Sequence, residues 1–338
     1  MLKKCNRDHN KHRKPYVDLK TTSSGARDET EREATFIKAI ASHKPVIFRS
    51  YGGRPGGLGK NKTTQEITKF LAYHSGHGAP SPYCQLQGQA AGTIEYTNLL
   101  AEFVKAPQDR SYRANVLGFP LMHNPAIMTN INWPSVLRKF DIIQHISTPS
   151  SSSFDTHRKV AKPPADAAFA VVSMEGSFTT FHLDKLSTYA VLSEGCKIWT
   201  FFPNSEENKQ IRARWQESQG LGCFKDCFVI SCHPGDLLFI PSGWHHAVYT
   251  VRDSLMLGGH YLVAEEMARN LQVATELMTD CKFSSNDSLT GLKQYFINIV
   301  TVFPSQRGLL ICRTSNAIFL HLRLVILESR KLKVGMNS

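Results

Sequence analysis

The sequence of 338 residues has little of what marks a secreted or membrane-spanning protein. Its first residues are polar and basic, and no apolar run followed by a cleavage site is present, so we expect no secretory signal. A long apolar stretch near the end covers residues 308–327, but Arg313, His321 and Arg323 interrupt it. Because charged side chains are costly in the bilayer core, we expect no membrane span there.

Closely paired cysteines are also missing. The eight cysteines are scattered and form no C-x-x-C pair, which suits a reducing compartment better than a disulfide-stabilised domain. Cys223, Cys227, Cys232 and His233 lie close in sequence, but their spacing is not that of paired zinc ligands. We therefore predict ordinary thiols at these positions.

Acidic residues are scarce beside basic ones. The chain has 28 Asp and Glu against 40 Lys and Arg, a net charge of +12, which indicates affinity for anions such as nucleic acid. A hydrophobic content of 41% with 20% charged residues is typical of a globular protein, and the length allows two domains or one elaborated barrel. Residues 1–32 are polar and basic, and we predict a disordered tail there, with a nuclear-targeting or DNA-contacting arm as the alternative.

The most informative stretch lies between Gly176 and Gly259, and its first part contains an H-x-D pair. Alternate side chains of a strand face the same way, so His182 and Asp184 would share one face while apolar neighbours occupy the other. This pattern is typical of a barrel strand with a metal ion on its inner side and packing on its outer side.

A third candidate ligand follows in the later part of the same stretch. Residues 234–236 form a turn signal, 237–240 an apolar strand and 241–243 a second turn. The next strand would present Trp244, His246 and Val248 on one face and His245, Ala247 and Tyr249 on the other. Two histidines and one carboxylate are the ligand set of a facial triad, which holds iron and leaves positions open for a co-substrate and dioxygen.

These motifs resemble those of the JmjC domain. The similar segments are Phe178-Thr-Thr-Phe-His-Leu-Asp184, Gly195-Cys-Lys197, Ile240-Pro-Ser-Gly-Trp-His-His-Ala-Val248 and Asp253-Ser-Leu-Met-Leu-Gly-Gly259. The late segment is most similar to the histone lysine demethylase branch. The resemblance covers roughly residues 110–262 and implies a mainly β fold with flanking helices. That fold is a double-stranded β-helix, a jelly-roll or cupin-like barrel, with N-terminal α/β elements and C-terminal helices.

The resemblance also implies the metal ligands. His182, Asp184 and His246 match the iron ligands of the family. His246 is preferred to His245 because of its place relative to the glycine before it and the valine after it. The expected metal is Fe(II).

Three further residues match positions that bind the co-substrate 2-oxoglutarate. Thr179 matches a hydroxyl ligand, Lys197 matches the lysine that pairs with the far carboxylate, and Asn115 resembles an asparagine near the co-substrate. The demethylases also have an aromatic residue available to 2-oxoglutarate shortly before the lysine. Here the spacing is shorter, and that place falls on Tyr189 or Ala190.

The resemblance implies an Fe(II)- and 2-oxoglutarate-dependent oxygenase that uses dioxygen. The late segment favours demethylation of methyl-lysine on histone tails through N-methyl hydroxylation. His260-Tyr261 stands where demethylases usually have asparagine and phenylalanine, so a protein side-chain hydroxylase stays open. A catalytically silent chromatin-binding module is a third possibility. We expect a nuclear protein with a histone tail as substrate, possible nucleosomal DNA contact through its basic surface, and no membrane partner.

The chain divides into four predicted regions. They are a basic disordered tail (1–32), a helical and strand region packing on the barrel (33–165), the barrel core (166–263) and a C-terminal helical region (264–338). Predicted helices cover 33–40, 64–74, 97–106, 264–280 and 289–303. Predicted strands cover 45–49, 167–174, 198–202, 237–240 and 244–249.

Overall fold

The computed structural model describes residues 15–20, 27–51, 83–86, 92–93, 113–120, 168–184, 186–216, 220–263 and 266–279. The helices predicted at 64–74, 97–106 and 289–303 and the apolar stretch at 308–327 lie outside these residues. Within the described ranges, no helix is both long and apolar enough to cross a bilayer.

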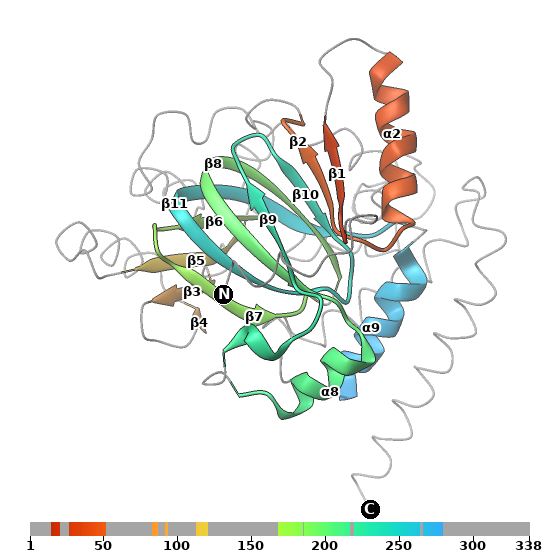
Figure 1. Ribbon diagram of the computed structural model, residues 1–338. Helices are drawn as coiled ribbons and strands as arrows, with labels where there is room; N and C mark the ends of the chain where they lie inside the picture. Colours follow the sequence, from red (N-terminus) through yellow and green to blue (C-terminus); the bar gives the residue numbers. More distant parts are fainter. Residues whose placement is uncertain are drawn as a thin grey trace, which may run out of the picture.

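The described strands form one mixed sheet that curls around a central core (Figure 1). They are β1 (Val17–Lys20), β2 (Val46–Arg49), β3 (Tyr83–Leu86), β4 (Gly92–Thr93), β5 (Ala114–Pro120), β6 (Phe169–Ser173), β7 (Phe178–His182), β8 (Ser187–Phe202), β9 (Phe228–Cys232), β10 (Leu237–Ile240) and β11 (His245–Tyr261). The order along the sheet is β1-β2-β10-β8-β11-β6-β5-β3-β4, with β7 paired to β11 and β9 paired to β8. Only β1 and β2 run parallel among these pairs.

The two long strands β8 and β11 form the centre of the sheet. They pair antiparallel from Ser187 opposite Tyr261 to Phe202 opposite His245, with irregularities between Thr250 and Met256 that bend the ladder. Strand β8 is rich in β-branched and aromatic residues, which suit a pleated, buried surface. The predicted fold class, a mainly β barrel of the jelly-roll type with flanking helices, is confirmed.

An apolar cluster fills the inside of the curled sheet. It is built from alternate residues of several strands, which point to the same face. Its buried members are Ile47, Val171, Ala190, Leu192, Trp199, Phe201, Phe228, Ile230, Cys232, Leu238, Ile240, Val248 and Met256. This cluster forms the wall on which the candidate site is built.

Helix α2 (Arg27–Ile40) covers the outer face of the sheet. Phe36 packs against Phe48 of β2 and Phe239 of β10, with ring centroids 6.2 and 4.5 Å apart. The prediction of a disordered tail up to residue 32 is wrong for residues 17–20 and 27–32, because β1 pairs with β2 and α2 begins at Arg27. Residues 1–14 of that tail lie outside the described part of the chain.

Two further helices lie at one end of the barrel, α8 (Glu206–Arg214) and α9 (Met267–Thr279), with a short 3-10 helix η2 at Leu221–Cys223 (Figure 1). The helix predicted over 264–280 corresponds to α9. This helix braces two parts of the barrel. Asn270 Oδ1 accepts from the Ser187 amide at 2.8 Å, and Arg269 Nε donates to the Ser242 carbonyl at 2.6 Å. The second contact fixes the turn that leads into β11.

Candidate metal centre

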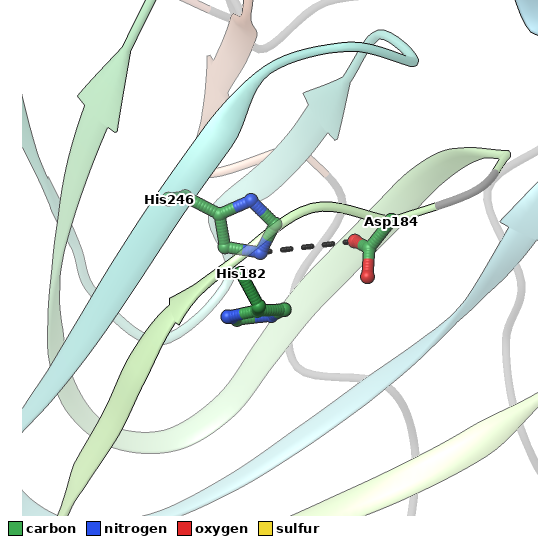
Figure 2. Close-up of side chains that lie close together, drawn as sticks. All are labelled: His182, Asp184 and His246. Carbon is green, nitrogen blue, oxygen red and sulfur yellow. Dashed lines mark ion pairs between the residues drawn. The ribbon is translucent and has the colours of Figure 1, made fainter. Parts of the chain in front are cut away.

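Three side chains predicted as metal ligands meet inside the barrel. His182 ends β7, Asp184 follows it, and His246 is the second residue of β11. One ligand atom of each lies within 4.8 Å of the others. The two imidazole centroids are 4.2 Å apart, and His246 Nε2 is 3.7 Å from Asp184 Oδ2 (Figure 2). Among the described residues, this is the group of histidines, cysteines and carboxylates close enough to share one ion.

Both histidines are oriented by the backbone. His182 Nδ1 bonds to the Thr180 carbonyl at 2.7 Å, and His246 Nδ1 bonds to the Trp244 carbonyl at 3.1 Å. A carbonyl oxygen only accepts, so Nδ1 of each ring carries a proton, and Nε2 is the ring nitrogen left for a metal. Burial, followed by the neighbouring His182, lowers the pKa of His246 to about 4, so its imidazole is neutral at physiological pH. Neutral imidazoles with a free Nε2 are the form that binds metal.

The carboxylate is held from the neighbouring strand. Thr188 Oγ1 donates to Asp184 Oδ2 at 2.9 Å, and His260 Nδ1 lies 3.4 Å from the same hydroxyl. His260 is opposite Thr188 in the β8–β11 ladder and is 6% exposed. His260 stands where demethylases usually have asparagine, and its imidazole contacts Thr188, which in turn contacts Asp184. The motif alone did not predict this position.

An irregularity in β7 brings Thr179 to the same face as His182. Strict alternation would put residues three apart on opposite faces. However, His246 pairs with His182 while Val248 pairs with Thr179, so β7 has one more residue than β11 between these two pairs. This is the arrangement of a β-bulge, which re-aims the side chains around it.

A chain of hydrogen bonds joins the three residues predicted to bind the co-substrate. Lys197 Nζ donates to Ser173 Oγ at 2.7 Å and to Thr250 Oγ1 at 3.1 Å. Ser173 Oγ donates to Asn115 Oδ1 at 2.7 Å, and Asn115 Nδ2 donates to Thr179 Oγ1 at 2.9 Å. The structure thus connects Asn115, Thr179 and Lys197 into one polar network. Ser173 and Thr250, which sequence reasoning missed, are its other members.

Lys197 is an unusual lysine because it is 1% exposed. Burial lowers its pKa to about 7, and among the described residues no carboxylate lies within ion-pair distance of it. A buried ammonium group is stabilised by a partner of opposite charge. The end of a dicarboxylate would supply that charge, so this environment fits the far carboxylate of 2-oxoglutarate.

A second observation supports the same fit. Ser254 lies directly opposite Ser173 in the β6–β11 ladder, so the two side chains share a face. Ser254 is 2% exposed, and its Oγ has no hydrogen-bond partner among the residues that the structure describes. Buried hydroxyls are normally hydrogen-bonded, and a bound carboxylate would accept a bond from it. Ordinary strand serines carry no sequence signal that could have identified this one.

Two side chains considered from the sequence point away from the centre. His245 lies on the outer face, stacked on Phe181, and its Nε2 accepts from Arg212 Nη1 at 2.9 Å. This supports His246 as the ligand of the pair. Tyr189 packs in the cluster under α2, whereas Ala190 belongs to the inner cluster. The place of the family's aromatic co-substrate residue is therefore occupied by an alanine on the inner face.

The cysteines considered for zinc have different environments. Cys223 is exposed, Cys227 is half-buried and Cys232 is buried in the inner cluster opposite Lys197. Burial raises the pKa of the Cys232 thiol well above its usual range, so it stays protonated. Cys232 therefore behaves as an apolar core residue.

The donor set of the centre fits iron(II). Two imidazoles and one carboxylate that lie this close together are the protein ligand set of non-haem iron oxygenases, and His182, Asp184 and His246 would hold such an ion. Residues 144–269 match the family model of the JmjC domain. The chain carries a JmjC domain.

The chain also aligns with relatives that are named for a JmjC domain. The chain is 26% identical over 232 residues to "JmjC domain-containing histone demethylation protein 1" of Candida albicans. This alignment covers 61% of the chain and 47% of the relative. Proteins of the same name from Debaryomyces hansenii and Caenorhabditis briggsae are 28% and 31% identical. They align with 47% and 71% of the chain, and with 32% and 24% of their own lengths. The chain thus spans less than half the length of these relatives.

Proposed function

We propose that this protein is an Fe(II)- and 2-oxoglutarate-dependent oxygenase that removes methyl groups from lysines of histone tails. The observation that carries the proposal is the convergence of His182, Asp184 and His246 on the same face of the sheet as a buried Lys197 that has no carboxylate partner among the described residues. A metal site that shares a face with a buried cation suits a dicarboxylate co-substrate that also binds the metal. The names of the aligned relatives support histone demethylation as the outcome.

Each residue of the centre has a distinct role in this proposal. Iron(II), when bound, supplies the oxidising chemistry that couples conversion of 2-oxoglutarate to succinate and carbon dioxide with insertion of oxygen into a C–H bond. His182, Asp184 and His246 hold the ion, and Thr188 orients the carboxylate. Lys197 anchors the far carboxylate of the co-substrate through a charge-assisted bond.

The inner wall of the barrel shields this chemistry from water. Trp199 and Phe201 pack beside His246, with ring centroids at 5.3 and 5.9 Å. Apolar walls lower the local dielectric and keep reactive species away from solvent. The hydroxyls of Ser173, Thr250 and Thr179 line the polar side, where the co-substrate would lie.

The outcome depends on which carbon is oxidised. Hydroxylation of an N-methyl group gives a hemiaminal that collapses to formaldehyde and the demethylated amine. Hydroxylation of a side-chain carbon gives a stable product. The inward-facing His260, at a place where demethylases usually have asparagine, is the feature that favours a protein hydroxylase as the second candidate.

Turnover assays test this proposal. We expect 2-oxoglutarate to be converted to succinate with Fe(II), with stimulation by a methylated histone H3 peptide and release of formaldehyde. His246→Ala removes a ligand and should abolish turnover, whereas His233→Ala, at an exposed position, should not. Peptide mass spectrometry separates the candidates, because a demethylase removes a methyl mass and a hydroxylase adds an oxygen mass. Absence of turnover under all conditions would favour a silent chromatin-binding module.

We also place the protein in the nucleus, close to nucleosomes. The names of the relatives support contact with chromatin. The net charge of +12 supports contact with nucleosomal DNA, since a basic histone tail would not attract a basic protein.

A further inference from the structure

Directly behind the two ligand histidines, on the outer face of the sheet, lies a second pair of rings. Phe181 precedes His182 and His245 precedes His246, and these two neighbours stack with centroids 5.0 Å apart and planes at 11°. Both are buried, at 6% and 3% exposure. The outer pair therefore joins the same two strands that carry the inner ligand pair.

This outer pair lies where the backbone pairing of β7 is irregular. The bulge leaves the last part of β7 attached to β11 through the single registered pair of His182 with His246. A one-residue slip would turn His182 to the outer face. Phe181 opposes such a slip, because it stacks on Phe224 at 4.7 Å and packs against Trp215 at 5.3 Å.

Helix α8 fixes the other ring of the pair. Arg212 Nη1 donates to His245 Nε2 at 2.9 Å, and a guanidinium only donates, so His245 accepts there and carries its proton on Nδ1. The helix that presents Arg212 is itself anchored. Ser205 caps its first turn, and Lys209 bonds to Glu276 of α9 at 3.5 Å. Arg212 thus joins a fixed helix to the residue beside a metal ligand.

We propose that Arg212 and His245 are positioning residues for the metal centre, holding Phe181 and the β7 bulge so that Thr179 and His182 face inward together. Arg212 contacts His245, and His245 contacts Phe181, so both act through the backbone of the ligand strands. This inference rests on the metal site proposed above.

Cobalt(II) binding tests the proposal without turnover, because its ligand-field absorption reports coordination geometry. We expect Arg212→Leu to weaken Co(II) binding about 10-fold, the usual effect of losing a group that orients a ligand, and to change the absorption bands. Arg212→Gln keeps an N–H donor and should restore part of the affinity. Arg214→Leu is the matched control, since it removes an exposed cation from the same helix without removing the contact to His245 or the bond of Lys209 to α9.

A double-mutant cycle makes the test specific to the contact. His245→Phe keeps an aromatic ring for stacking and removes the acceptor, so it should weaken binding as Arg212→Leu does. The double variant should then be no weaker than either single variant, because the two substitutions break one interaction. Near-UV circular dichroism checks that each variant is folded. If Arg212→Leu does not fold, Arg212→Gln and His245→Phe carry the comparison.

The outcomes separate this proposal from the metal site itself. A wild-type protein that binds no Co(II) would overturn the metal centre. Wild-type binding together with unchanged affinity and spectra in His245→Phe would overturn the positioning role alone. Equal losses in Arg212→Leu and Arg214→Leu would show a general effect of α8 and would also overturn the positioning role.

Discussion

Lys197 combines a buried position with a group that is normally charged. Its ammonium group is bonded to two hydroxyls, and Cys232, opposite it in the β8–β9 ladder, remains a protonated thiol. Burial therefore lowers the pKa of Lys197 from 10.5 to about 7. Without a ligand, the unfolded chain binds more protons than the folded protein between these two values. Stability should accordingly rise with pH across that window.

The same lysine predicts proton uptake when the co-substrate binds. At a pH of about 8 the amine is mostly neutral, and a bound carboxylate favours the charged form, so 2-oxoglutarate binding should take up a proton. Calorimetry in buffers of different ionisation enthalpy measures this uptake. At a pH of about 6 it should vanish, because Lys197 is already protonated. Lys197→Met should weaken binding and remove the uptake. An enthalpy independent of buffer at both pH values would contradict the prediction.

At the residue scale, the sequence predicts which side chains lie together where a motif pairs chemistry with spacing. His182, Asp184 and His246 were predicted together, and the structure brings them together. The prediction failed where chemistry depends on folding alone. Ser173 and Thr250 are ordinary strand residues until pairing places them beside Lys197.

Among the elements, β8 differs most from its prediction. The sequence predicts only a strand at 198–202 in this region, but β8 runs unbroken from Ser187 to Phe202. Gly195 has a φ of +89°, and a Cβ there would lie 2.2 Å from the Asp253 carbonyl oxygen and 2.6 Å from Ser254 Cα. The glycine therefore marks an irregularity where β8 and β11 approach closely, and not the end of a strand.

This close approach predicts a large effect of a small substitution. Gly195→Ala should reduce the free energy of unfolding by about 2 kcal/mol or more, because it adds backbone strain and a clash with β11. Urea denaturation measures the change. The matched control is Gly222→Ala in η2, where nothing lies within 4 Å of the added methyl group. The control should change stability by less than about 0.5 kcal/mol. Equal effects of the two substitutions would disprove the role of the contact.

Other elements were predictable to the extent that their residues are apolar and periodic. The strand at 237–240 and the helix within 264–280 were predicted from such patterns. Helix α8 is mostly charged, and β1 lies in a basic segment, so neither has the apolar periodicity that indicates a core-facing element. Both depend on contacts far away in sequence, β1 on β2 and α8 on α9.

At the scale of the whole molecule, the positive charge is unevenly distributed along the sequence. The residues that the structure describes carry 14 Lys and Arg against 15 Asp and Glu, so they are close to neutral. The excess positive charge of the chain therefore belongs to the other segments. A contact with nucleosomal DNA would then depend mainly on those segments and little on the described barrel.

Salt dependence of nucleosome binding tests this distribution. Affinity should fall steeply with added salt, with a slope that reflects about one counterion for each phosphate contacted. One variant replaces basic residues of the N-terminal segment with glutamine, namely Lys3, Lys4, Lys11, Arg13 and Lys14. It should bind more weakly and with a shallower slope. The matched control replaces Lys225 and Arg252, two exposed residues of the described part, and should keep the slope of the wild type. A flat salt response would exclude DNA contact. A shallower slope in the Lys225 and Arg252 variant alone would assign the DNA contact to the barrel.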